Sequence, residues 1–162
     1  MDIEQARYNM IEQQIRPWDV LDVDVLKIIK ETPRELFTPK QYQNLAFSDL
    51  EIPLQDGQFM MVPKVEARML QALQIKSSDE ILEIGTGSGF ITACLAKPGG
   101  YVDTIEYHKD LSNHAQSILE QLKINNVSFI HGDALNDLGN NKQYNVIVVT
   151  ASMPLYNDIL SP

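Results

Sequence analysis

The chain has 162 residues, about the size of one domain, and 44% of them are hydrophobic, so a packed core is expected rather than disorder. The net charge of −9 argues against a duplex nucleic-acid partner, and the single cysteine excludes an internal disulfide or a zinc cluster. The first residues are polar and no apolar run is long enough to span a bilayer, so we expect a cytoplasmic protein that does not enter membranes.

The first part of the chain is predicted to be helical. Residues 2–15 carry apolar side chains near helical spacing, and Pro17 is expected to end this helix. Asp22 is placed to cap a second helix. Residues 46–63 show no long periodic pattern and are predicted to form an ordered loop. A third helix is expected to begin near Pro63, because proline is favoured in the first helical turn.

From about residue 77 the pattern changes to alternating strands and helices. Strands are predicted at residues 81–85, 101–106, 127–131 and 145–150, with helices at 88–96 and 108–124. Such alternation is typical of an α/β protein with a parallel, doubly wound sheet. The last of these strands is apolar enough to be buried on both faces. We expect one domain, with an N-terminal segment of residues 1–76 and a β–α core of residues 77–162.

A glycine-rich turn joins the first strand of this core to its first helix. The glycines fall at positions 85, 87 and 89, and Glu106 ends the next strand twenty-one positions after the first of them. This order is the plan of a nucleoside-binding half-fold. The spacing is G-x-G-x-G rather than the G-x-G-x-x-G of dinucleotide sites. With Glu83 two residues before the turn, it resembles motif I of the S-adenosylmethionine (SAM) dependent methyltransferases. A turn that binds nothing is the weaker interpretation, because Glu106 is also in place.

That resemblance implies a set of cofactor-binding residues. Glu106 would accept hydrogen bonds from both ribose hydroxyls. Asp133, after the third strand, would accept from the adenine amino group or would cap a helix. Thr150 lies at the carboxyl edge where ligands sit, or it only ends the last strand. The predicted set is Glu83, Gly85, Thr86, Gly87, Gly89, Glu106, Tyr107, Asp133, Ala134 and Thr150.

Segments outside the turn are similar to one family, the protein-L-isoaspartate O-methyltransferases. Residues 32–39 resemble its V-P-R-E-x-F-V-P segment, and residues 46–49 resemble its A-Y-x-D. Residues 57–63 fall where the family has G-Q-T-I-S-Q-P. Residues 83–89 match its E-I-G-T-G-S-G in full, and residues 131–133 match its H-G-D.

The resemblance implies a Rossmann-like class I SAM methyltransferase fold with strand order 3-2-1-4. It also implies methyl transfer from SAM to the free α-carboxylate of an isoaspartyl residue in a damaged protein or peptide, which is a step of protein repair. S-adenosyl-L-homocysteine would be the product. A carboxylate is already ionised at neutral pH, so this displacement needs positioning and water exclusion rather than a general base.

One position departs from the family. The serine that is assigned as catalytic in the family falls on Met61, and a thioether cannot donate a hydrogen bond. The predicted catalytic positions are therefore Met61, Gln58 and Asp49, although Asp49 is equally explained as an exposed loop acid. The departure leaves two alternatives open: a related methyltransferase with another small-molecule acceptor, or a SAM-binding protein without catalysis.

The core is also shorter than the family's fold, in which further strands follow the fourth. We expect a truncated chain or an incomplete gene product. Strand 145–150 would then be a bare apolar edge, which invites pairing with another chain. This predicts a possible homodimer through that strand, or its coverage by the chain's own terminal segment.

Overall fold

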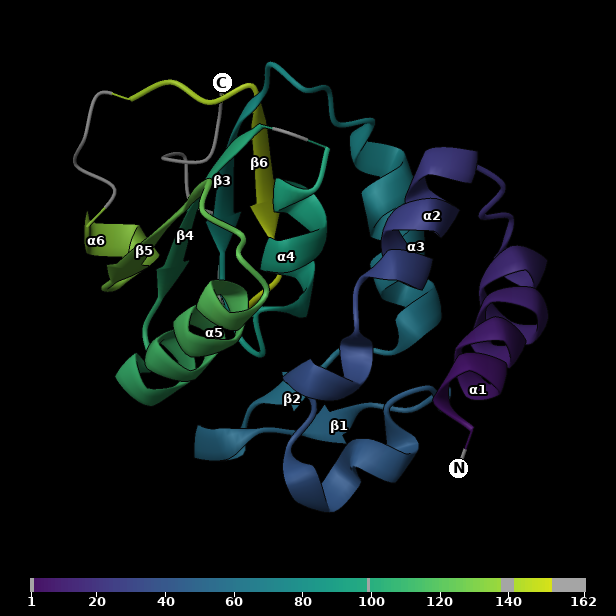
Figure 1. Cartoon of the computed structure of the whole chain (residues 1–162). Helices are drawn as coiled ribbons and strands as arrows, with labels where there is room; N and C mark the ends of the chain where they lie inside the picture. The colour runs from purple at the N-terminus through teal and green to yellow at the C-terminus, as the bar shows by residue number, and fades with distance from the viewer. Residues whose placement is uncertain (1, 99, 138–141, 153–162) are drawn as a thin grey trace. The chain divides into compact units, whose positions relative to one another are not determined.

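The computed structural model describes residues 2–98, 100–137 and 142–152 (Figure 1). The chain divides into two compact units, residues 1–74 and residues 75–162. None of the described helices combines the length and the apolarity that crossing a bilayer requires.

The first unit opens with a helix that changes its winding twice. The α-helix α1 (Ile3–Met10) continues as π-helical turns over Ile11–Ile15 and as a 3-10 turn over Arg16–Trp18. The helix predicted for residues 2–15 is confirmed. Pro17 does not end it, because proline lies within the first two positions of the 3-10 turn, where its missing N–H removes no helical bond. The chain leaves the helix at Asp19, which has a φ of 58°.

Two further α-helices complete the helical part of this unit, α2 (Val23–Glu31) and α3 (Pro63–Leu73). The side chain of Asp22 accepts hydrogen bonds from the backbone N–H groups of Asp24 and Val25, at 2.9 and 3.1 Å. The predicted cap and the predicted start of the third helix are both confirmed.

The segment between α2 and α3 contains more structure than the sequence suggested. Three 3-10 turns, Arg34–Phe37, Lys40–Leu45 and Gln55–Gly57, accompany an antiparallel pair of strands, β1 (Ile52–Pro53) and β2 (Phe59–Met60). The prediction of a loop over residues 46–63 was wrong in this respect. Strands of two residues are too short to show an alternating pattern. Buried Ile52 and Met60 face each other across the pair.

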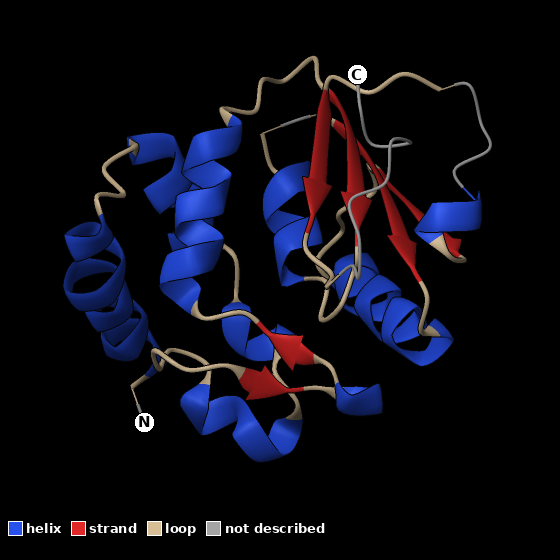
Figure 2. Cartoon of the chain, turned by 180° about the vertical axis from the view of Figure 1, so that it is seen from behind, coloured by secondary structure: helices blue, strands red, loops and turns tan. Residues whose placement is uncertain are grey.

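The second unit is built on a four-stranded parallel sheet in the order β5-β4-β3-β6. Its strands are β3 (Glu80–Ile84), β4 (Tyr101–Glu106), β5 (Val127–His131) and β6 (Val146–Val149). Its helices are α4 (Phe90–Ala96), α5 (Lys109–Gln121) and the short α6 (Ala134–Asp137). Figures 1 and 2 show α4 and α5 on the same face of the sheet. The predicted parallel sheet and its order 3-2-1-4 are confirmed.

The core of this unit lies on both faces of the central strand β3. Every residue of α4 is buried. Leu82, Ile84 and Ile105 form a cluster with Ala134 of α6. The sheet therefore holds the end of β3, and the turn that follows it, between packed layers.

The strand β6 is less buried than predicted. Ile147 and Val149 are each 39% exposed, and within the described residues β6 pairs with β3 alone. The prediction of burial on both faces was therefore wrong, because β6 is an edge strand of the described sheet. The backbone N–H of Glu80 donates to the side chain of Asn145 at 2.8 Å, which fixes the entry of β6.

Candidate functional site

Three glycines shape the turn between β3 and α4. Gly85, Gly87 and Gly89 have φ values of 98°, 53° and 85°, in the left-handed region that favours glycine. A Cβ atom on Gly85 would lie 2.6 Å from the Cβ of Ala151, and one on Gly89 would lie 2.7 Å from the Cβ of Ala115. The turn is thus pressed against α5 on one side and against the residues after β6 on the other.

Glu106 anchors this turn from the end of β4. Glu106 is buried, with 6% of the residue exposed. One carboxylate oxygen accepts from the N–H of Gly87 at 2.8 Å, and the other accepts from the N–H of His108 at 3.0 Å. A carboxylate offers about four lone-pair sites, so each oxygen keeps capacity for a further donor. An ionised carboxylate accepts hydrogen bonds and donates none, so it suits the two hydroxyl donors of a ribose.

Glu83 lies beneath the turn in a network of hydroxyl groups. Its Oε2 accepts from Thr92 at 2.5 Å and from Thr104 at 2.7 Å, and Thr104 shares a hydrogen bond of 2.6 Å with Thr86 of the turn. No part of Glu83 is exposed, and burial raises the pKa of its carboxyl to about 8. Its Oε1 has no partner among the described residues. The geometry makes Glu83 a support of the turn from below, and its contact with a cofactor stays a prediction.

The predicted residues after β4 and β5 lie at the same edge of the sheet. Tyr107 follows Glu106 and is 69% exposed. Asp133 follows β5 and precedes Ala134, the first residue of α6. The carboxylate of Asp133 accepts from the side chain of Asn136 at 2.7 Å. The donor of this bond is a side-chain amide and not the backbone N–H that a helix cap binds, so the cap and the ligand interpretations of Asp133 both remain open.

Thr150 closes the site after β6. Its hydroxyl lies within hydrogen-bond distance of two carbonyl oxygens, at 3.0 Å from that of Ile84 and 2.5 Å from that of Gly85. The hydroxyl is therefore a local brace that ties the end of β6 to the start of the glycine turn. The carboxyl ends of all four strands, which Figure 1 marks by the arrowheads, thus bring the predicted cofactor set together.

The three predicted catalytic positions lie in the first unit and are dissimilar in environment. Gln58 is exposed and donates to the carbonyl of Asp56 at 3.2 Å. Asp49 is exposed and forms an ion pair of 2.7 Å with Lys64. Met61 is half-buried. No side-chain hydrogen bond joins these three positions among the described residues, so their catalytic role stays a prediction.

Sequence reasoning gave no role to a buried ion pair in this unit. Arg34 and Glu66 are 1% and 2% exposed, and their side chains meet at 2.7 Å. Burial raises the pKa of Glu66, while the Arg34 guanidinium opposes the rise. The arginine inside the T-P-R-E segment is part of the family resemblance, but the sequence around it gives no sign of its partner Glu66. Thr92 and Thr104 were also missed, because nothing local links them to Glu83.

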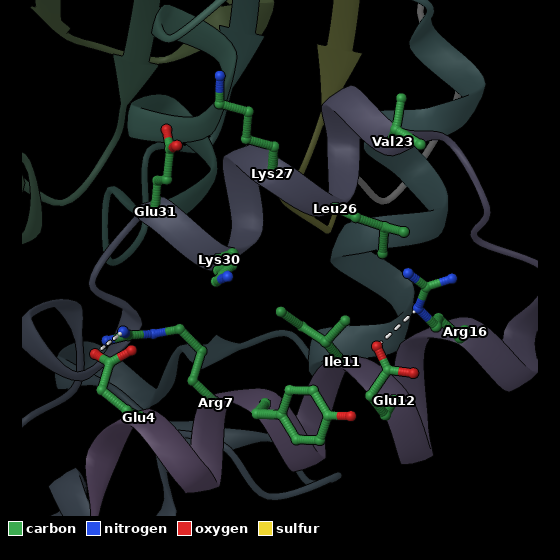
Figure 3. A pocket seen from close by; sticks show the side chains of 11 residues that line it. Glu4, Arg7, Ile11, Glu12, Arg16, Val23, Leu26, Lys27, Lys30 and Glu31 are labelled. Carbon is green, nitrogen blue, oxygen red and sulfur yellow. Dashed lines mark hydrogen bonds and ion pairs between the residues drawn. The ribbon is translucent and has the colours of Figure 1, made fainter.

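A separate open pocket of about 430 Å³ lies between α1 with its π-helical extension and α2 (Figure 3). Its arginines are paired, since Arg7 binds Glu4 at 2.6 Å and Arg16 binds Glu12 at 2.9 Å. None of the predicted site residues lines it.

The parallel sheet in this order, the G-x-G-x-G turn and the buried acid at the end of the next strand define a class I SAM-dependent methyltransferase. The family model described as protein-L-isoaspartate(D-aspartate) O-methyltransferase matches residues 5–158. The chain belongs to this family, and the predicted family, reaction type and methyl donor are confirmed.

Curated relatives and solved structures agree with this assignment. A protein-L-isoaspartate O-methyltransferase of Aliivibrio salmonicida is 34% identical over 96% of this chain and 75% of the relative. One from Koribacter versatilis is 38% identical over 91% of this chain and 67% of the relative. A Plasmodium falciparum structure described as an enzyme of this type, in complex with S-adenosyl-L-homocysteine, has a TM-score of 0.78 at 21% identity over 99% of this chain and 78% of that one. A protein-L-isoaspartate O-methyltransferase structure has a TM-score of 0.74 at 26% identity, over 91% of this chain and 47% of that one.

Proposed function

We propose that this chain transfers the methyl group of SAM to the free α-carboxylate of an isoaspartyl residue in a damaged protein or peptide. The observation that carries the proposal is the Glu106 carboxylate, held by two backbone N–H groups beside a turn of three left-handed glycines. Family membership supports the acceptor class.

The chemistry needs few groups from the protein. SAM supplies a methyl group activated by a sulfonium. The step forms a bond between an acceptor carboxylate oxygen and the methyl carbon and breaks the sulfur–methyl bond, giving a methyl ester and S-adenosyl-L-homocysteine. The acceptor is ionised before it binds, so no proton has to be removed. The work of the protein is to hold the two reactants in line and to exclude water.

In this proposal different residues at the sheet edge bind different parts of SAM. Glu106 accepts from the ribose hydroxyls, and Asp133 accepts from the adenine amino group. The turn from Gly85 to Gly89 gives the methionine portion close access to the backbone.

Met61 supports a second candidate function, a methyltransferase of the same descent with a different acceptor. A half-buried thioether at this position presents an apolar, polarisable surface and no donor for a carboxylate. A small acceptor with an apolar face would suit it better than a charged peptide group.

The two functions are separated by a transfer assay with methyl-labelled SAM. We expect label in an isoaspartyl peptide and none in the matching aspartyl peptide. Calorimetric titration with SAM runs beside it, so that a protein that binds SAM and labels neither peptide overturns the isoaspartyl proposal. Met61→Ser should raise the rate if the hydroxyl is the missing group, and Met61→Ala is the matched control that removes the thioether without adding a donor.

We also propose that the edge strand β6 pairs with a second copy of the chain. The support is the exposure of Ile147 and Val149 and the single described neighbour of β6. Light scattering after size exclusion should give a dimer, and Val149→Lys should convert it to a monomer. A wild-type monomer at high micromolar concentration would argue for another cover over this edge.

A further inference from the structure

Arg34 joins three segments of the first unit through one buried guanidinium. Its Nε donates to the carbonyl of Ala46 at 2.8 Å, and its Nη2 donates to the carbonyl of Met61 at 2.8 Å. Its Nη1 donates to the Glu66 carboxylate at 2.7 Å. The residue is 1% exposed. All three of its nitrogens are therefore used, and each binds a segment that is distant in the chain.

The bond to Met61 falls where the backbone has no other regular support. The ladder between β1 and β2 ends at the pair Ile52 and Met60, and α3 begins at Pro63. Met61 lies between these two elements. The Arg34 guanidinium supplies the hydrogen bond that neither the strand pair nor the helix provides, and it sets the direction of the peptide group at this position.

We propose that Arg34 is a positioning residue for methyl transfer, because it holds the backbone of Met61 in the orientation that the acceptor meets. The inference rests on the proposed function and on the prediction that Gln58 and Met61 are catalytic positions. Glu66 has a different part, because its carboxylate balances the charge of the buried guanidinium.

A lysine cannot replace Arg34 in this role. The guanidinium is a planar fork with donors fixed in three directions, whereas an ammonium is a compact charge on a flexible stem. A lysine at this position can keep the ion pair with Glu66. It cannot at the same time reach the carbonyls of Ala46 and Met61 in their present directions.

Arg34→Lys is therefore the principal test, and Arg7→Lys is its matched control. Arg7 is also a buried arginine of the first unit, at 8% exposure, but it binds the carboxylates of Glu4 and Glu35 and no carbonyl of residues 58–61. We expect Arg34→Lys to lower kcat/KM for the isoaspartyl peptide about 10- to 100-fold, as a small misplacement at a reacting centre does. The Kd for SAM should stay within about twofold, because the predicted cofactor set lies in the other unit. Arg7→Lys should leave kcat/KM unchanged at a temperature where both variants are folded.

A double variant keeps the test decisive if Arg34→Lys fails to fold. Arg34→Met with Glu66→Leu replaces the buried pair by apolar side chains, an exchange that is often neutral for the ion pair itself, while the carbonyls of Ala46 and Met61 lose their donor. It should fold, bind SAM and lose transfer to the same extent. An active wild type with equally active Arg34 variants overturns this inference alone. A wild type and a Met61→Ser variant that bind SAM but methylate no isoaspartyl peptide overturn the proposed function and this inference with it.

Discussion

The buried carboxyl of Glu83 should make the second unit less stable as pH rises. Burial raises its pKa from the usual 4.5 to about 8. Between these two values the folded chain keeps a proton that the unfolded chain has released. The free energy of unfolding therefore falls by about 1.4 kcal/mol for each pH unit. The contribution of Glu83 is complete below about pH 4.5 and is lost as pH rises through 8, a difference of roughly 4 to 5 kcal/mol.

Glu83→Gln removes this dependence, because an amide does not ionise. The amide oxygen can still accept from Thr92 and Thr104, but its NH2 group takes the place of Oε1, which has no partner among the described residues. We expect the variant to be less stable than wild type by about 1–3 kcal/mol at pH 5. It should become the more stable protein near pH 9.

Urea unfolding at pH 5, 7 and 9, followed by circular dichroism, measures both proteins. Glu120→Gln, which removes an exposed carboxyl from α5, is the control for the loss of a charge as such. If the difference between wild type and Glu83→Gln stays within about 1 kcal/mol over this range, Glu83 does not change its charge on folding and the reasoning fails.

Three further substitutions test the glycine turn, its anchor Glu106 and the cap of α2. Gly89→Ala puts a methyl group 2.7 Å from the Cβ of Ala115, so it should lower the free energy of unfolding by about 2–4 kcal/mol and abolish SAM binding. Gly57→Ala is the control, because Gly57 has a similar φ and a Cβ there would meet no atom within 4 Å. It should have less than half of this effect on the free energy of unfolding. Glu106→Gln should weaken SAM binding about 10- to 100-fold in calorimetric titration, and unchanged affinity would remove Glu106 from the site. Asp22→Ala should lower the free energy of unfolding by about 1 kcal/mol, from the lost cap, with methyl transfer unaffected.

The glycine turn was predictable because its determinants are local. Gly85 and Glu106 are separated by a single helix and strand, and the parallel order of the sheet brings their segments to one edge. The cap at Asp22 and the helix start at Pro63 were predictable for the same reason, since a helix start depends on a few neighbouring residues.

The contacts that the sequence did not predict are distant in the chain. Glu83 meets Thr104 across 21 positions, and Arg34 meets Glu66 across 32. A buried acid in a strand and an arginine in a turn give no local sign of their partners. Burial of β6 was overestimated for a related reason, because an apolar sequence does not say whether a strand is central or at an edge.

The main-chain character of the Arg34 bond explains how Met61 can differ from the family without disturbing the fold. Arg34 binds the carbonyl of residue 61, which every side chain leaves in place. A serine or a methionine at this position would therefore be presented by the same backbone. Under the proposed function, the substitution would change what the acceptor meets and would leave the hydrogen bond from Arg34 in place. This is why Met61→Ser is expected to act on the rate of transfer more than on the free energy of unfolding, while Arg34→Lys is expected to act on both.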